Sequence, residues 1–94
     1  MLVEPLKTRD AQRLIREIVR DGNVAFNGHA LEEMAKDDLC TTDVVNLLRG
    51  GVVEPAELEN GSWRHRVRTA RICAVVAFRS ASELRVVTAW RMKS

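Results

Sequence analysis

Hydrophobic positions in the first half of the chain recur at helical spacing. Between residues 9 and 21 the apolar residues follow the i, i+3, i+4, i+7, i+8 pattern of one buried helix face. These residues are Ala11, Leu14, Ile15, Ile18 and Val19. Thr8 is a candidate N-cap and Gly22 a candidate C-terminal stop. The pattern predicts a helix over residues 9–21, followed by a short extended piece at 24–26.

Two shorter apolar stripes predict a second and a third helix. Asn27 is a candidate cap for the second helix, and Thr41 or Thr42 for the third, which would end at Gly50-Gly51. The expected buried positions are Ala30, Leu31, Met34 and Ala35 in the second helix, and Val44, Val45, Leu47 and Leu48 in the third. We therefore expect the first half of the chain to be helical, with its acidic excess on exposed helix faces.

The second half alternates between apolar and polar residues and predicts strands. Residues 52–59 are extended but contain Pro55, which is typical of an edge strand or an irregular arm. Asn60-Gly61 is a hairpin turn signal, and strands are expected at 62–68, 71–79 and 83–91. Helices first and strands second predict an α+β fold in a single domain, 1–94. N-terminal helices would pack on one face of a three- to four-stranded antiparallel sheet.

Strand alternation sorts these side chains into two faces. A two-residue loop at Thr69-Ala70 and a three-residue loop at 80–82 would turn the bulky apolar residues toward the helices. That helix side would hold Trp63, His65, Val67, Ile72, Ala74, Val76, Phe78, Leu84, Val86, Thr88 and Trp90. The open side would hold Arg64, Arg66, Arg68, Arg79, Arg85 and Arg91 around Cys73, Val75, Ala77, Val87 and Ala89. Such a face predicts a groove for a single strand of nucleic acid.

The charge distribution agrees with a polyanion partner. The net charge of +2 is divided unevenly: residues 1–48 carry six basic and nine acidic side chains, and residues 49–94 carry nine basic and four acidic. From Ser62 onward the basic residues are almost all Arg, which makes planar bidentate contacts with phosphate. From charge alone, a solvated sheet face kept soluble by arginine is the alternative interpretation.

Several protein classes do not fit this sequence. No apolar run approaches the roughly 20 residues of a membrane span, and the first residues do not resemble a secretory signal. Cys40 and Cys73 are isolated, which suits a reducing compartment and two buried, inert thiols. We expect a cytoplasmic protein with no membrane partner.

The segment GHALEEMAKDDLCTTDVVNLLRGG, residues 28–51, resembles a small bacterial family. The signature of that family is His-Ala, a Met some four residues on, and a short helix that ends in Gly. The family sits close to the MqsR and RelE toxins of type II toxin–antitoxin pairs. RLIREIVRDGNV resembles the opening helix of MqsR-like toxins, SWRHRVR their Trp-containing strand, and LRVVTAWRMKS their last strand.

The resemblance implies a RelE-like fold and a metal-independent endoribonuclease that cleaves messenger RNA, with or without the ribosome, and so inhibits translation. It also implies a cognate antitoxin and no cofactor, because the ribose 2′-OH itself attacks the phosphate. Such a site needs a proton acceptor, positive charge for the transition state and a donor for the leaving oxygen. By position, Arg91 matches the basic residue after the last-strand aromatic, and Arg64 and Arg68 lie on the matching Trp-containing strand.

The sequence departs from that pattern in two places. It contains no Tyr, and Lys36 follows Met34 where the relatives often carry Arg. Any role that relatives give to a tyrosine is therefore vacant.

Three residues are candidate catalytic groups. His29 is the candidate for proton transfer, because a neutral imidazole titrates near physiological pH; the alternative is that it caps the second helix or packs under the sheet. Arg66 and Arg91 are candidates for contact with the scissile phosphate. The candidate RNA-binding residues are Arg64, Arg68, Arg79, Arg85 and Lys36.

Other interpretations remain open at this point. His65 is expected to be a core histidine. A zinc site built from His29, His65, Cys40 and Cys73 lacks motif spacing, so no metal is predicted. A non-catalytic module that binds RNA or protein with the same fold is the main alternative. A DNA-binding regulator is weaker, since no recognition helix is evident.

Overall fold

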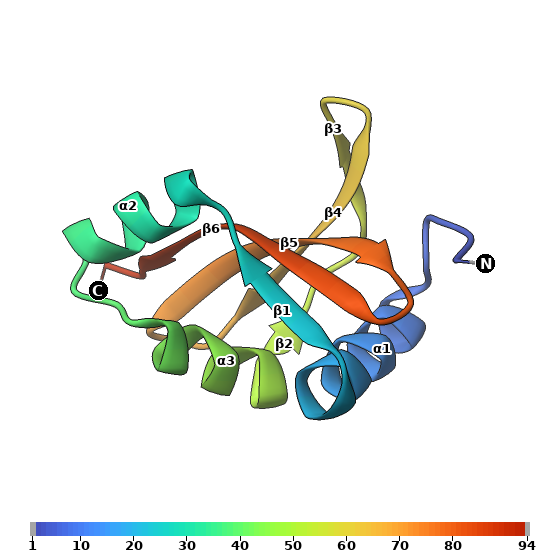
Figure 1. Ribbon diagram of the computed structural model, residues 1–94, viewed down its shortest axis with the longest axis horizontal. Helices are drawn as coiled ribbons and strands as arrows, with labels where there is room; N and C mark the ends of the chain where they lie inside the picture. The colour runs from blue at the N-terminus through green and yellow to red at the C-terminus, as the bar shows by residue number, and fades with distance from the viewer. Residues whose placement is uncertain (1, 94) are drawn as a thin grey trace.

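The computed structural model describes residues 2–93 and has an α+β architecture (Figure 1). Its helices are α1 (Thr8–Asp21), α2 (Gly28–Lys36) and α3 (Thr41–Gly50). Its strands are β1 (Asn23–Phe26), β2 (Val52–Val53), β3 (Glu57–Glu59), β4 (Ser62–Arg68), β5 (Ile72–Ser80) and β6 (Glu83–Arg91). The prediction of N-terminal helices on one face of a sheet is confirmed. No helix in this part of the chain is long and apolar enough to cross a membrane.

The sheet is mixed rather than purely antiparallel. Its strand order is β1-β6-β5-β4-β2, and β3 also pairs with β4. The β4–β5–β6 meander is antiparallel as predicted, but β1 pairs with β6 in parallel, from Asn23 opposite Glu83 to Phe26 opposite Val86. The expectation of three to four antiparallel strands is therefore wrong. The short 24–26 segment is a strand because it covers a β6 edge that would otherwise lack backbone partners.

The apolar core lies between the sheet and α1 and α3, which cover the same face (Figure 1). The strands contribute Val67, Ala74, Val76, Phe78, Leu84, Val86 and Ala89 to this core. The helix α2 packs against the second half of β6, beyond the end of β1, and buries Ala30 and Met34. Leu31 is exposed, so the predicted stripe of α2 is narrower than expected. The opposite face of the sheet carries neither α1 nor α3.

Local chemistry sets the helix ends. Lys7 occupies the N-cap position of α1, so Thr8 opens the helix rather than caps it. The C-cap is Gly22, as predicted, and a Cβ at this position would collide with the carbonyl oxygen of Ser82. The neighbouring Asn23 N–H donates to that same oxygen at 2.9 Å, so glycine allows the turn to lie directly against the β5–β6 connection.

Side chains cap the other two helices. Asn27 caps α2 as predicted, and its Oδ1 accepts the Ala30 N–H at 2.6 Å. Cys40, rather than either predicted threonine, is the N-cap of α3, and Asp43 Oδ2 accepts the Cys40 N–H at 2.9 Å. Cys40 is exposed, which corrects the expectation of two buried thiols, whereas Cys73 is buried.

A bulge in β6 places the side chains of its second half on the opposite faces from those predicted. Val76 lies opposite Val86, but the preceding Val75 lies opposite Thr88, so Val87 is an extra residue without a partner. Such a bulge shifts the alternation by one position. Ala89 is therefore buried in the core, and the predicted positions of four residues are wrong. Thr88 and Trp90 lie on the open face, whereas Ala89 and Arg91 lie on the helix side.

The segment 52–59 is an interrupted edge, as predicted. β2 pairs with the end of β4, β3 pairs with its start, and Pro55 falls between them. The Asn60-Gly61 turn has φ values of 52° and 75°, which suit a tight hairpin. The resulting β3–β4 hairpin projects away from α1 and α3 (Figure 1).

Candidate nucleic-acid interface

Strand β4 places its alternate arginines on the open face of the sheet, as the sequence predicts. Arg68 lies opposite Cys73, and Arg66 lies opposite Val75. The β4–β5 connection is longer than the predicted two residues, and Thr69 N–H donates to the Ile72 carbonyl oxygen at 2.9 Å. The pairing is shifted by two positions relative to the prediction, and an even shift leaves every side chain on its expected face.

Two rows of side chains cross this open face. The first row runs from Arg68 through Cys73 to Trp90, and the second runs from Arg66 through Val75 to Thr88. Cys73 and Val75 are buried although neither α1 nor α3 covers them. Longer neighbouring side chains shield such a floor, because arginine lays its alkyl stem along apolar surface. The indole of Trp90 is half-buried at the end of the first row.

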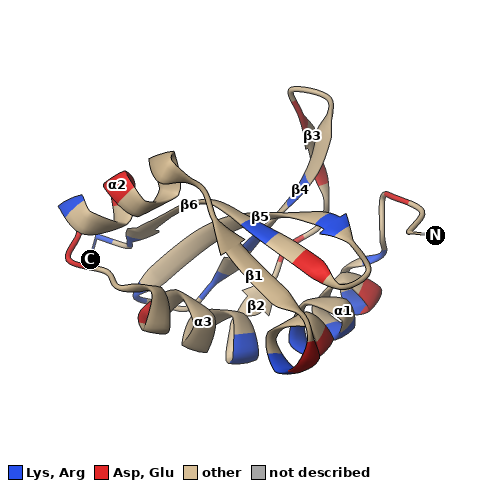
Figure 2. Cartoon of the chain, viewed as in Figure 1, with Lys and Arg blue, Asp and Glu red and all other residues tan. Residues whose placement is uncertain are grey.

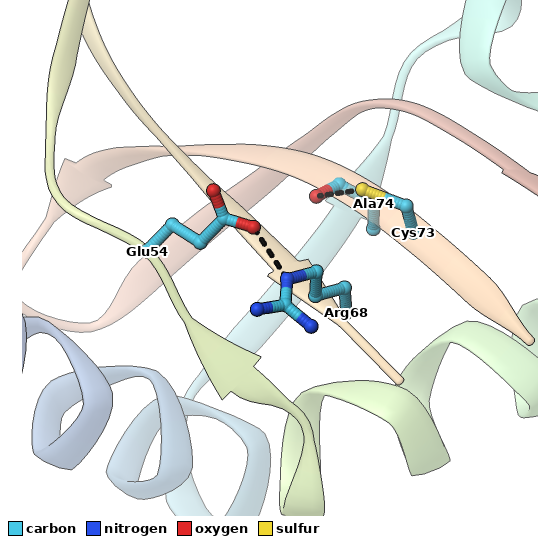
Figure 3. A network of polar contacts seen from close by, with 4 residues as sticks. All are labelled: Glu54, Arg68, Cys73 and Ala74. Atoms are coloured by element: carbon cyan, nitrogen blue, oxygen red, sulfur yellow. Dashed lines mark hydrogen bonds and ion pairs between the residues drawn. The ribbon is translucent and has the colours of Figure 1, made fainter. Parts of the chain in front are cut away.

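An acidic residue that the sequence pattern does not predict, Glu54, also lies on this face. The N–H of Glu54 donates to the Arg66 carbonyl oxygen at 2.8 Å and continues the β2 pairing, so its side chain points to the arginine side. Glu54 Oε2 accepts the Arg68 Nε–H at 2.6 Å (Figure 3). Because Pro55 interrupts the strand pattern directly afterwards, the sequence offers no register for Glu54. A carboxylate and two guanidinium groups therefore share one end of the open face.

Cys73 lies on β5, opposite Arg68 of the neighbouring strand β4 (Figure 3). Burial raises the pKa of its thiol above the usual 9.0, and the nearby charges of Arg66 and Arg68 only partly oppose that effect. The thiol is therefore protonated at neutral pH, whereas nucleophilic chemistry needs the thiolate. The prediction of an inert Cys73 agrees with this environment.

The other end of the open face is a hollow of about 380 Å³ beside the β3–β4 turn. Arg64, Arg79 and Arg85 line it, and they come from three different strands. The remaining lining residues are Asn27, Asn60, Ser62, Ala77, Phe78 and Val87. The Arg64 Nε atom is buried and has no hydrogen-bond partner within residues 2–93.

Arg91 does not join the arginine face, which corrects the prediction. Its Nε donates to the Asp37 carbonyl oxygen at 2.7 Å and its Nη2 to the Asp38 carbonyl oxygen at 3.1 Å. Its backbone N–H donates to Asp37 Oδ2 at 2.8 Å. The side chain thus binds the end of α2, where orphan carbonyl groups favour a cation.

Two predicted residues, His29 and Lys36, form no contact with the arginine–carboxylate group, and His65 contacts it only through the Glu54 backbone. His29 is exposed in the first turn of α2, two residues after Asn27, and it does not line the hollow. Lys36 is exposed and its Nζ lies 3.2 Å from Glu33 Oε1. His65 is 1% exposed, with Nδ1 3.0 Å from the Glu54 carbonyl oxygen, so the prediction of a core histidine is confirmed.

A second basic surface lies on α1, on the helix side of the molecule. Figure 2 shows basic positions both along α1 and on the strands. The α1 row is formed by Arg9, Arg13, Arg16 and Arg20. All four are exposed, and Arg20 pairs with Asp21 at 2.8 Å. The expectation that exposed helix faces carry the acidic excess is therefore wrong for α1, and this row is the natural control surface for the open face.

No group of three or more His, Cys, Asp and Glu side chains within residues 2–93 is arranged to hold a metal ion. Comparison with protein-family models, curated proteins and solved structures finds no match to this chain. The open face carries the chemistry from which a function can be inferred. That face offers several guanidinium groups for phosphate, the Trp90 indole for a base, and the Glu54 carboxylate as a proton acceptor beside Arg68.

Proposed function

We propose that the protein is a metal-independent endoribonuclease of the RelE/MqsR toxin type, and that it binds and cleaves messenger RNA on its open sheet face. The observation that carries this proposal is the group formed by Glu54, Arg66 and Arg68, with Trp90 on the same face of the sheet beyond Cys73. It brings a base, positive charge and an aromatic surface together on one side of the sheet.

Arginine side chains along the strands support binding of a single-stranded RNA. Phosphate contacts would supply most of the affinity and make it depend strongly on salt. Trp90 is the aromatic side chain on this face that can stack a base, a contact worth about 1–3 kcal/mol. Because stacking and phosphate contacts tolerate any base, we expect weak sequence preference from these two interactions.

Glu54 is the group on this face that can start the reaction. Its carboxylate would take the proton from a ribose 2′-OH as the 2′-oxygen attacks the adjacent phosphorus. The bond from phosphorus to the 5′-oxygen then breaks, which yields a 2′,3′-cyclic phosphate and a 5′-hydroxyl that takes its proton from water. Arg66 and Arg68 would stabilise the negative charge that develops on the phosphoryl oxygens.

This assignment changes the roles expected from the sequence. Arg66 keeps its predicted role as a phosphate contact. Arg91 is hydrogen-bonded to the end of α2, so we give its predicted role at the scissile phosphate to Arg68. His29 lies outside the Glu54 group, so we give the proton transfer to Glu54. A toxin of this type would act in the cytoplasm and would be held inactive by a cognate antitoxin, whose acidic residues would complement the arginine face.

A non-catalytic RNA-binding module is the second candidate. The short Arg68–Glu54 ion pair favours it, because a carboxylate bound to an arginine can orient that arginine without taking part in any reaction. The absence of Tyr also favours it, since the toxins that the sequence resembles often use tyrosine side chains in the site. The two candidates differ in the role of Glu54. In the endoribonuclease it takes a proton during cleavage, and in the binding module it only orients Arg68.

A cleavage and binding assay on purified protein separates these candidates. Labelled RNA is incubated with wild type, Glu54→Gln, Arg66→Gln and Arg13→Gln, and products are tested for 2′,3′-cyclic phosphate ends. We expect Glu54→Gln to bind RNA at least as tightly as wild type but to cleave about 10²–10⁴-fold more slowly. Arg66→Gln should lose both functions, and Arg13→Gln, on α1, should lose neither. Binding without cleavage by wild type would favour the module, and absence of binding would reject both.

A further inference from the structure

The hollow lined by Arg64, Arg79 and Arg85 is separate from the Glu54 group. Arg64 and Arg68 are four residues apart on β4, or about 13 Å at a strand rise of about 3.3 Å per residue. The Arg68 side chain is hydrogen-bonded to Glu54, whereas the Arg64 side chain lies beside Glu59, so the two guanidinium groups are held at opposite ends of the strand. We propose that the hollow is a second phosphate-binding subsite, which takes the phosphate of a nucleotide other than the one that is cleaved. The inference rests on the proposed function only in assigning that phosphate to RNA.

The placement of the Arg64 side chain supports an anion site in the hollow. Its Nε–H is buried and has no acceptor among residues 2–93, although the rest of the guanidinium group is accessible from the hollow. The side chain is 21% exposed, so its position is constrained by its surroundings. Because the Nε–H itself is buried, a phosphate in the hollow would contact the Nη groups of Arg64, which donate charge-assisted hydrogen bonds.

The charge balance of the hollow also favours an anion. Glu59 lies 3.7 Å from Arg64 Nη1, and Glu83 lies 3.6 Å from Arg79 Nε. Both ion pairs are long and involve exposed carboxylates, so they hold the arginines weakly. Arg85 forms no ion pair within residues 2–93. Three cations against two loosely held carboxylates leave a net positive charge for a ligand.

The other lining residues suit a nucleotide rather than a bare inorganic anion. Asn27 uses Oδ1 to cap α2, which leaves its Nδ2 group as a donor at the rim. Asn60 and Ser62 add polar groups from the hairpin, and Ala77 and Val87 form an apolar floor. An apolar floor with amides at the rim can hold a sugar or base next to a phosphate on the arginines.

The test follows the Arg64 Nε–H resonance by NMR during titration. The probes are adenosine, adenosine 5′-monophosphate, and a 2′-O-methyl hexanucleotide with either a 5′-phosphate or a 5′-hydroxyl, which cannot be cleaved. We expect the monophosphate and both hexanucleotides, but not adenosine, to shift this resonance. Tighter binding of the 5′-phosphorylated hexanucleotide would assign the subsite to a terminal phosphate, and equal binding would assign it to an internal phosphodiester.

Variants make the assignment specific. Arg64→Gln and Arg85→Gln should each weaken binding of the hexanucleotide about tenfold, since each removes a charge-assisted hydrogen bond. Glu59→Gln should strengthen it by removing the carboxylate that competes for Arg64, and Arg13→Gln should leave it unchanged. Thermal melting of each variant shows whether it folds.

The outcomes separate this inference from the proposed function. RNA binding that is unchanged in Arg64→Gln and Arg85→Gln, with no shift of the Arg64 resonance, would overturn the subsite and leave the proposed function intact. A shift with the monophosphate but no RNA binding would support the subsite and overturn the proposed function. No shift with any phosphorylated probe would overturn the subsite outright.

Discussion

Trp90 lies directly opposite Cys73 in the β5–β6 pairing, which places its indole on the open face of the sheet. The unpaired Val87 causes this arrangement, since without it Trp90 would point toward the helices. The same bulge buries Ala89, a small residue that fits the layer beneath α1 and α3 better than an indole would. The core therefore contains Ala89 where regular alternation would place Trp90, and the open face carries an indole in addition to its arginines.

The first prediction concerns this indole. Trp90→Leu should weaken RNA binding by about 1–3 kcal/mol, because a stacked base would lose its aromatic partner. In a Trp63→Phe protein, Trp90 is the remaining tryptophan, and its fluorescence should be quenched by a single-stranded RNA. Wild-type affinity in Trp90→Leu would show that the indole does not touch the nucleic acid.

The second prediction concerns the salt dependence of binding. Each phosphate contact on a single strand contributes about 0.7 to the slope of log K against log salt concentration. Arg66→Gln should therefore reduce this slope by about 0.7, whereas Arg13→Gln on α1 should not change it. Affinities measured by anisotropy at several salt concentrations give both slopes. An equal reduction in the two variants would mean that RNA binds the whole basic surface without preference for the sheet.

The third prediction concerns Arg91, which ties β6 to the end of α2. Arg91→Ala should lower the free energy of unfolding by about 1–2 kcal/mol, because it removes two hydrogen bonds from a charged donor at a solvent-accessible site. RNA affinity should change much less than in Arg66→Gln. Urea unfolding and RNA titration of both variants test this, with Arg71→Ala as a control for loss of an exposed arginine. A loss of RNA affinity in Arg91→Ala with an unchanged free energy of unfolding would show that Arg91 contacts the RNA.

The fourth prediction concerns the pH dependence of stability through Asp43. The Cys40 N–H, together with the Cys40 thiol and Arg91, holds the pKa of the Asp43 carboxyl below its ordinary 3.8. A carboxyl with a lowered pKa in the folded state stabilises the protein above pH 3.8 and loses that effect as pH falls through the lowered value. Asp43→Asn should therefore melt below wild type at pH 7, and the difference should shrink toward pH 3. Asp10→Asn serves as the control, and a constant difference across this range would exclude the linkage.

Much of the fold could be predicted because it depends on local patterns. The apolar spacing of α1, the Gly22 stop and the Asn27 cap are properties of short segments. The Asn60-Gly61 turn likewise follows from residues that accept positive φ. The alternation of Arg64, Arg66 and Arg68 held even though the loop after β4 was longer than expected, because an even shift of register keeps each face.

Only the tertiary structure decided the composition of the candidate site. Alternation cannot reveal an extra residue such as Val87, because a bulge is defined by the partner strand. The parallel pairing of β1 and the return of Glu54 to the arginine face depend on strands distant in sequence. The sequence by itself therefore determined which elements form and that one face is basic. Long-range strand pairing decided that Trp90 and Glu54 join that face and that Arg91 leaves it.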